Sequence, residues 1–291
     1  MLIAILGGLG ASVFWAAADV LIKKSVDKIS TLLSLFLFRL GTVICTFPLV
    51  FYDKSSLEWS GEIIWLIIGF AILQLVITAL LFSAFRFGKV SFVSPIVSTY
   101  TLISAIISFM FFGEEFESVK LILVGFVYLG IILVGLGLNK ENSESSLEKG
   151  KNHSYGFFAA IAVMVAYAIF FPAYDSFIDR DGWGMLIFVE STFVTLLVVP
   201  FLLMNFKEVV KTPKKVFWIA LFAGLFNGLG NLGLSLGLEF SEQTTVTVAA
   251  ASSTSAVAVL FAYIFLKERM GRLQYLGISV IVFGLILSVL F

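Results

Sequence analysis

Long apolar runs separated by short polar segments dominate the pattern of this chain. Each run comes close to the roughly 20 residues that an α-helix needs to cross a hydrocarbon core, and none shows the alternation typical of a half-buried strand. Because backbone donors and acceptors must be paired inside a bilayer, these runs are expected to be transmembrane helices. The sequence predicts ten of them, at residues 2–22, 32–51, 63–85, 92–112, 121–138, 155–177, 185–204, 216–238, 244–266 and 273–291. The polar residues 177–182 predict a turn between the sixth and seventh runs.

Composition supports this interpretation. Hydrophobic residues make up 60% of the 291 positions and charged residues 13%, which is too little polar surface to cover a water-soluble globule of this size. No basic residue precedes the first run, so we expect a retained span rather than a cleaved signal. The single cysteine, Cys45, excludes an intramolecular disulfide, and the single histidine, His153, has no neighbouring metal-type ligands. No cofactor or metal is therefore predicted.

Basic residues are distributed unevenly between the loops on the two sides of the predicted spans. Of the 19 lysines and arginines, 15 lie in loops that follow the odd-numbered runs, three lie in the opposite loops, and Arg39 lies within a run. Basic loops are retained on the cytoplasmic side during insertion. We therefore predict a multi-pass protein of the plasma (cytoplasmic) membrane with both termini outside.

A polar stretch divides the ten runs into two sets of five. This stretch, residues 139–153, is expected to be a cytoplasmic linker between a first repeat, 1–138, and a second repeat, 154–291. Because five is an odd number, the second repeat must enter the membrane in the opposite sense to the first. The predicted fold class is thus an all-α integral membrane protein of two inverted five-helix repeats, whose relative rocking can expose a central site to either side.

The two halves also share the spacing of several polar positions. Glu114 follows the fourth run at the place where Glu268 follows the ninth, and Gln74 in the third run corresponds to Asn227 in the eighth. Together with glycine-rich fifth and tenth runs, these features resemble the EamA branch of the drug/metabolite transporter superfamily. The resemblance covers nearly the whole chain and implies a cavity lined by spans 1, 3, 4, 6, 8 and 9. That branch includes exporters of amino acids and drugs, uptake carriers and carriers of lipid-linked sugars, so the resemblance implies transport without identifying the substrate.

Charged residues within the predicted spans are the sharpest functional signals. An arginine at the centre of a membrane helix costs about 2.5–3.5 kcal/mol on insertion scales, so it needs a partner or a watery cavity. Arg39 lies near the middle of the second run, and Glu190 lies in the seventh, where the family pattern is uncharged. They are expected either to bind substrate or change protonation during transport, or to serve packing as a static pair, with headgroup contact as a further role for Arg39. Asp19 is expected to pair locally with Lys23, one helical turn away.

Uncharged polar and aromatic residues complete the candidate site. Amides and hydroxyls inside a membrane must hydrogen-bond to neighbouring helices or to a solute, and aromatic rings can cover a cation or anchor the interface. The candidate substrate-binding or coupling residues are Arg39, Glu190, Gln74, Asn227, Asn231, Trp15, Tyr100, Tyr167, Ser98 and Ser252. Glycines at four-residue spacing in the eighth run predict close helix packing. They are Gly224, Gly228, Gly233 and Gly237.

These features predict a secondary active transporter that moves a small metabolite by alternating access, with efflux of an amino acid or a similar solute favoured. An uptake permease or a lipid-linked-substrate carrier of the same fold is the alternative, and a non-transporting membrane scaffold is the alternative from another class. The chain is not expected to be an enzyme, because its sequence contains neither a phosphate-binding loop nor a cluster of catalytic type. The expected partners are a small-molecule substrate, a coupling proton or ion and membrane lipids, without nucleic acid, in a monomer or homodimer.

Overall fold

The computed structural model describes residues 2–48, 51, 61–107, 110, 125–126, 129–130, 132–134, 136, 153–181, 183–204, 206–239, 251 and 253–290. Within these residues the regular secondary structure is helical throughout, so the predicted all-α class is confirmed. The elements are α1 (Leu2–Val26), α2 (Thr31–Thr46), α4 (Gly61–Phe87), α5 (Val90–Ser98), α6 (Tyr100–Ile107), α8 (His153–Asp181), α9 (Trp183–Met204), α10 (Phe206–Lys211), α11 (Lys214–Glu239), α13 (Thr254–Phe261), the π-helix η2 (Ala262–Leu266) and α14 (Arg272–Leu290).

Several of these helices have the length and composition of membrane spans. Four contain apolar stretches long enough to cross a membrane, namely Leu6–Val26, Ile63–Phe87, Ile187–Met204 and Lys214–Leu234. Shorter apolar helices cover Thr31–Thr46, Ser154–Phe170, Thr254–Leu266 and Arg272–Gly284. The predicted fifth span, residues 121–138, lies largely outside the described residues, so the total of ten spans stays a prediction.

The fourth predicted span, residues 92–112, is not one continuous helix. α5 ends and α6 begins on either side of Thr99. The Thr99 hydroxyl donates to the Ile96 carbonyl at 2.7 Å, and the Thr99 backbone N–H donates to the same carbonyl at 3.2 Å. These bonds reach three residues back instead of four, which tightens the turn and interrupts the regular helix. The predicted continuous span is corrected accordingly.

The turn predicted at residues 177–182 is also wrong in its position. α8 continues through Asp181, and α9 begins at Trp183. Polar residues alone do not end a helix that emerges from an apolar region, whereas a glycine often does, and Gly182 is the first glycine in this segment.

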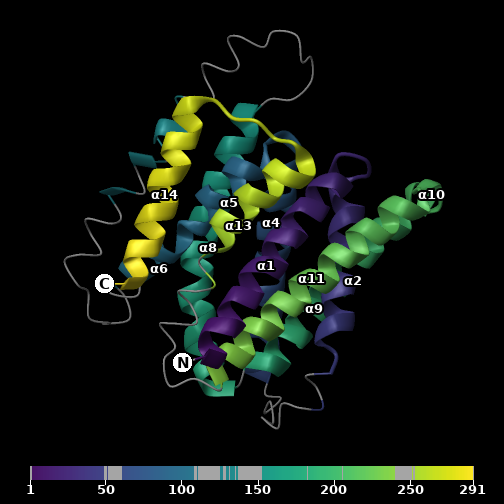
Figure 1. The fold of residues 1–291 in the computed structure, drawn as a ribbon. Helices are drawn as coiled ribbons and strands as arrows, with labels where there is room; N and C mark the ends of the chain where they lie inside the picture. Colours follow the sequence, from purple (N-terminus) through teal and green to yellow (C-terminus); the bar gives the residue numbers. More distant parts are fainter. Residues whose placement is uncertain are drawn as a thin grey trace.

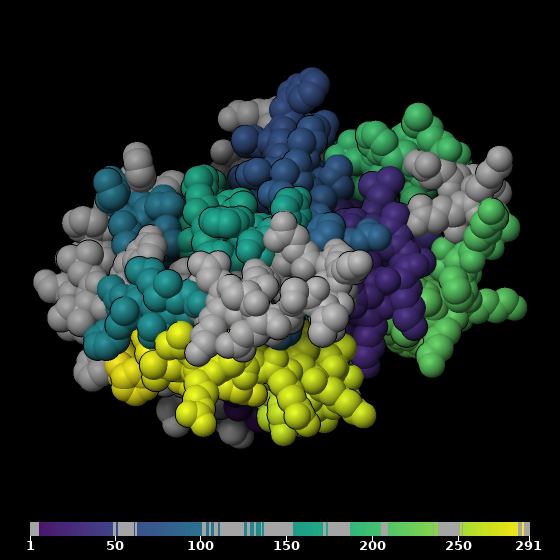
Figure 2. All heavy atoms as spheres, turned by 90° about the horizontal axis from the view of Figure 1, so that it is seen from above, coloured from purple at the N-terminus to yellow at the C-terminus, as the bar shows by residue number. Residues whose placement is uncertain are grey.

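α1 lies at the centre of the helix arrangement (Figure 1). It packs most extensively against α11 and also contacts α13, α4, α2 and α5. α2 packs against α11 and α9, and α8 packs against α4, α5 and α6, so helices from the two halves of the chain interleave. The start of α1 and the end of α14 both lie in the lower part of Figure 1. Seen from above, the purple amino-terminal residues lie beside both the green α11 region and the yellow carboxyl-terminal region (Figure 2).

Glycines allow α11 to approach α1 and α2 at backbone distance. A side chain at Gly224 would overlap the backbone of Phe38, and one at Gly228 would overlap a later part of α2. On the α1 side, a Cβ atom added at Gly7 would lie 2.6 Å from the Gly233 carbonyl oxygen. These contacts confirm that the glycines of the eighth run serve close packing.

Candidate functional site

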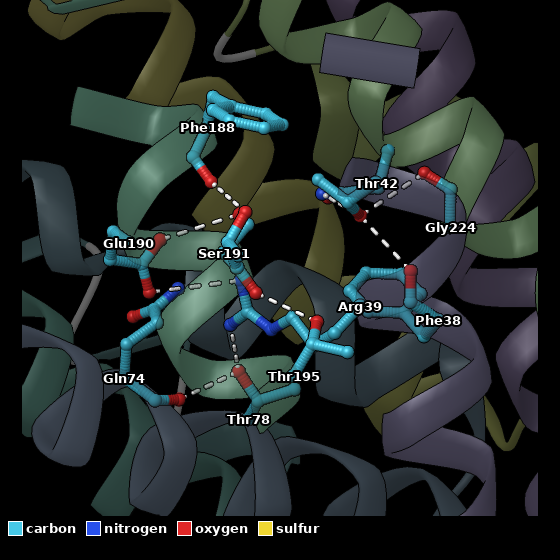
Figure 3. Close-up of polar contacts among 12 residues, drawn as sticks. Phe38, Arg39, Thr42, Gln74, Thr78, Phe188, Glu190, Ser191, Thr195 and Gly224 are labelled. Atoms are coloured by element: carbon cyan, nitrogen blue, oxygen red, sulfur yellow. Dashed lines mark hydrogen bonds and ion pairs between the residues drawn. The ribbon is translucent and has the colours of Figure 1, made fainter. Parts of the chain in front are cut away.

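Arg39 and Glu190 lie together in the interior of the helix arrangement (Figure 3). Arg39 projects from the middle of α2 and Glu190 from α9, with Arg39 Nη1 4.0 Å from Glu190 Oε1. Both are almost fully buried, with exposed fractions of 4% and 5%. α2 belongs to the first half of the chain and α9 to the second, so this ion pair joins the two halves.

Polar groups of α4 and α9 surround the ion pair (Figure 3). Arg39 Nη2 donates to the Thr78 hydroxyl of α4, and that hydroxyl donates to the Gln74 backbone carbonyl at 2.8 Å. The Ser191 hydroxyl lies 3.5 Å from Glu190 Oε2. Three buried atoms of this cluster make no hydrogen bond to the described part of the chain, and they are Arg39 Nε, Glu190 Oε1 and the Gln74 side-chain oxygen.

The ion pair therefore combines burial with unused hydrogen-bonding capacity. Removing two charges from water costs several kcal/mol per ion, and their attraction compensates only when the geometry is good and the remaining polar atoms are satisfied. A separation of 4.0 Å is long for such a pair, and Arg39 Nε and Glu190 Oε1 make no hydrogen bond to the described part of the chain. This arrangement can hold two helices together, and it can also accept a polar group of a solute when the helices separate.

The local pair predicted between Asp19 and Lys23 is wrong. Lys23 Nζ lies 3.3 Å from the Asp27 carboxylate and also donates to the Phe85 carbonyl at the end of α4. Asp19 instead accepts a 2.6 Å hydrogen bond from the Ser94 hydroxyl of α5. Lys23 has a carboxylate four residues away in both directions, and the negative end of the α4 dipole attracts its ammonium group away from Asp19.

The two asparagines of the candidate site connect α11 to its neighbours. Asn231 accepts a 3.1 Å hydrogen bond from the Trp15 indole of α1, and Asn227 donates to the Thr42 hydroxyl of α2 at 3.2 Å. Thr42 also bonds to the Gly224 carbonyl of α11 at 3.2 Å. In this conformation Asn227 and Asn231 therefore make the interhelical contacts expected as one of their two roles. For Trp15, the bond to Asn231 is a contact that the sequence did not predict.

Two tyrosines of the candidate site lie together. Tyr100 of α6 and Tyr167 of α8 have ring centroids 5.5 Å apart. α8 packs against α4 and α5, the helices that carry Thr78 and Ser94. The aromatic pair therefore lies on helices that adjoin both polar clusters.

The structure describes one of the two serines of the candidate site, Ser98. Ser98 lies at the end of α5 and donates to the Ser94 carbonyl at 2.9 Å, within its own helix. Ser252 lies outside the described residues. Ser94, which was not selected from the sequence, is the serine that meets a charged side chain.

Glu268 is a second residue whose contact the sequence did not reveal. Its carboxylate accepts hydrogen bonds from the backbone N–H groups of Val90 at 3.1 Å and Ser91 at 2.9 Å, in the first turn of α5. Lys267, with φ of 55°, ends η2 in the left-handed conformation and turns the chain toward α5. An anion at the amino end of a helix is favoured by the helix dipole. The Val90 and Ser91 amides lie nearly 180 positions earlier in the chain. The sequence indicated only that Glu268 follows an apolar run, so this contact could not be predicted from it.

Two cavities open at the ends of described helices rather than around the ion pair. One, of about 450 Å³, is lined by residues of α13, η2 and α14, such as Tyr263 and Tyr275, and by Glu268 in the segment between η2 and α14. The other, of about 180 Å³, lies between the end of α1 and the start of α11, where Lys28 and Pro213 line it. The ion pair lines neither of these cavities and is packed among α2, α4 and α9.

Comparisons with known proteins agree with this architecture. The EamA-like transporter family matches residues 2–136 and again residues 154–290. The chain is 25% identical over 291 residues to an uncharacterized transporter of Archaeoglobus fulgidus, with 98% of each protein covered. A protein of known crystal structure shares the fold, with a TM-score of 0.64 at 15% sequence identity, over 99% of this chain and 97% of the other. The family resemblance seen in the residues is thus confirmed, and the chain belongs to the EamA-like transporter family, whose domain it contains in two repeats.

Proposed function

We propose that this protein is a secondary active transporter that carries a small metabolite across the membrane by alternating access between its two halves. Membership of a transporter family supports transport as the general activity and argues against an enzyme. The observation that carries the mechanism is the buried ion pair between Arg39 of the first half and Glu190 of the second.

The position of the ion pair links it to relative motion of the halves. Arg39 and Glu190 stand on α2 and α9, so a rocking motion of one half against the other changes the distance between the two charges. Each charge is costly in an apolar interior without its partner. The pair therefore stabilises the state in which α2, α4 and α9 are packed, and a solute or proton that replaces one partner favours another state.

The amino-acid sequence supports a proposal for the substrate, the direction of transport and the orientation in the membrane. We favour efflux of an amino acid or similar solute, with uptake as the alternative. We place the protein in the plasma membrane with both termini outside, because the basic residues gather in the loops after odd-numbered spans. The same scheme treats residues 1–138 and 154–291 as the two moving repeats and 139–153 as the linker between them.

Flux measurements with purified protein in vesicles test this proposal. The vesicles are loaded separately with labelled amino acids, amines, nucleosides and sugars, and movement is followed in both directions. We expect saturable movement of at least one solute. The double variant Arg39→Met with Glu190→Leu should lose this flux while remaining folded, because it removes both charges together. Lys214→Met, which removes an exposed cation from the start of α11, should retain the flux.

Two results would contradict the proposal in different ways. Absence of flux for every solute would favour a non-transporting scaffold. Full flux in the double variant would show that the ion pair serves packing alone, and the proposed coupling role of Arg39 and Glu190 would then be wrong.

A further inference from the structure

Asp19 is enclosed by protein and nevertheless keeps accessible surface. No residue of α1 from Phe14 to Val26 is exposed, because this part of the helix is surrounded by α2, α4, α5, α11 and α13. Asp19 itself is half-buried. The Asp19 carboxylate therefore lies within the helix arrangement, where the Ser94 hydroxyl of α5 contacts it.

Among the described residues, no basic side chain pairs with the Asp19 carboxylate. The interior ion pair is neutral by itself, and Lys23 is paired with Asp27. Within the part of the chain that the structure describes, the polar partner of the Asp19 carboxylate is the neutral hydroxyl of Ser94. A carboxylate at membrane depth is costly unless a proton or another cation accompanies it. Asp19 therefore provides a negative charge that a mobile cation can neutralise.

The surroundings of Asp19 suit an organic cation. Trp15 lies one turn earlier on the same face of α1. The rings of Tyr100 and Tyr167 pack together on α6 and α8, and α8 packs against α5, which carries Ser94. Ser94 lies in α5, close to the break that separates this helix from α6. Aromatic faces attract ammonium groups, whereas a hard metal ion requires several oxygen ligands at short distance. An ammonium group attached to an apolar or aromatic body fits these residues better than a metal ion.

We propose that Asp19, oriented by Ser94, binds the protonated amino group of the transported solute. This inference rests on the transport function proposed above and narrows the substrate to the class of small amines. While α2, α4 and α9 are packed, Arg39 is paired with Glu190, so the described interior offers no free cation to a solute carboxylate in this state. The amino group alone is therefore sufficient for recognition, and a carboxylate on the solute is not required.

Binding of three solutes that share a phenyl ring tests this inference. Phenethylamine has the amino group, 3-phenylpropionate has the carboxylate, and phenylalanine has both. Calorimetry with the purified full-length protein should detect phenethylamine and phenylalanine, whereas 3-phenylpropionate should not bind. Asp19→Asn should weaken phenethylamine binding by about 10- to 100-fold, the range expected for loss of a charge-assisted hydrogen bond.

Asp27→Asn is the matched control, because it makes the same chemical change at an exposed position in the turn that follows α1, where Asp27 pairs with Lys23. It should leave phenethylamine binding unchanged. Ser94→Ala provides a second variant, which should weaken binding by a smaller factor than Asp19→Asn since the charge remains. The unfolding temperature of each variant, measured without solute, establishes that the protein is folded.

Three results would overturn the inference. They are equal phenethylamine binding by Asp19→Asn and the unaltered protein, preferential binding of 3-phenylpropionate, and absence of binding for both amines. If one of these is found while the vesicle panel shows flux of another solute, the transport proposal stands and only the amine site is wrong. If the panel shows no flux at all, the transport proposal itself fails.

Discussion

Two charged regions of the interior differ in how their charges are balanced. In the first region, among α2, α4 and α9, Arg39 and Glu190 neutralise each other and are almost completely buried. In the second region, between α1 and α5, Asp19 meets a serine hydroxyl and stays half-buried. A neutral buried pair can be part of the packing, whereas an isolated carboxylate needs a proton or a bound cation. The balance of charge within a region, rather than the presence of charged residues, therefore separates a contact between helices from a binding site.

The two regions also differ in whether their helices are continuous or interrupted. The first region is built on the continuous helices α2, α4 and α9. The second region includes α5, which ends at Thr99 and is held at its other end by the Glu268 carboxylate. Discontinuous helices are a common feature of transporter binding sites. The interrupted span thus lies beside the group for which we propose solute recognition.

Breaking the ion pair is expected to have the largest effect on stability. Glu190→Ala leaves Arg39 buried without a counter-charge and should reduce the free energy of unfolding by about 3–5 kcal/mol. Adding Arg39→Met to a Glu190→Leu variant should recover most of this loss. Asp19→Asn removes an unbalanced charge and should change stability little. Unfolding midpoints of the unaltered protein and of these four variants in the same detergent provide the measurement.

This series distinguishes the two regions directly. If Asp19→Asn destabilises the protein as much as Glu190→Ala does, Asp19 is a structural group like the ion pair. The contrast between the regions would then be lost.

Two glycine substitutions should produce an intermediate effect that differs between the regions. The methyl group of Gly224→Ala would overlap the backbone next to Arg39, which cannot move aside easily, so we expect a loss of about 1–3 kcal/mol. Gly230→Ala would instead place its Cβ 2.5 Å from the Trp15 ring, beside the second region. A side chain can shift more readily than backbone, so this variant should change amine affinity more than stability. Unfolding experiments measure the stability of each variant, and calorimetry measures its affinity for phenethylamine. If the two variants changed stability equally and affinity equally, the proposed difference between the two regions would be wrong.

Substitution of Glu268, which caps the amino end of α5, should have the smallest effect on stability. Glu268→Gln keeps one acceptor oxygen but removes the negative charge at the amino end of the helix, which typically costs about 0.3–1 kcal/mol. Because α5 carries Ser94, the variant should also weaken phenethylamine binding slightly. Lys267→Gln, a charge change at the neighbouring exposed residue, should leave binding unchanged. Weaker binding in Lys267→Gln than in Glu268→Gln would argue against a role for the cap.

Most helices could be predicted from the sequence because apolar run length is a local property. The first, third, seventh and eighth predicted spans correspond to α1, α4, α9 and α11 within a few residues at each end. The interruption at Thr99 could not be predicted, because it depends on whether a hydroxyl bonds to its own helix or to another group. α8 was predicted too short, since its polar end contains no residue that stops a helix before Gly182.

The candidate site was predictable only in part. Arg39 and Glu190 could be selected because a charge inside an apolar run is conspicuous, and the structure places them together. Asp19 was assigned to the wrong partner, because the spacing to Lys23 is equally good for Asp27 and the decision depends on where α4 ends. Tyr100 and Tyr167 meet across α6 and α8, which no spacing rule could indicate.

The amino-acid sequence alone was sufficient to identify a helical membrane protein of two similar halves, since hydrophobic length and charge placement are properties of neighbouring residues. The folded arrangement decided which charges cancel and which remain unbalanced. Ser94 reaches Asp19 across 75 positions, and Glu190 reaches Arg39 from the other half of the chain. Coulombic and hydrogen-bonding interactions depend on distances of a few ångströms in space, and these distances exist only once the helices have packed.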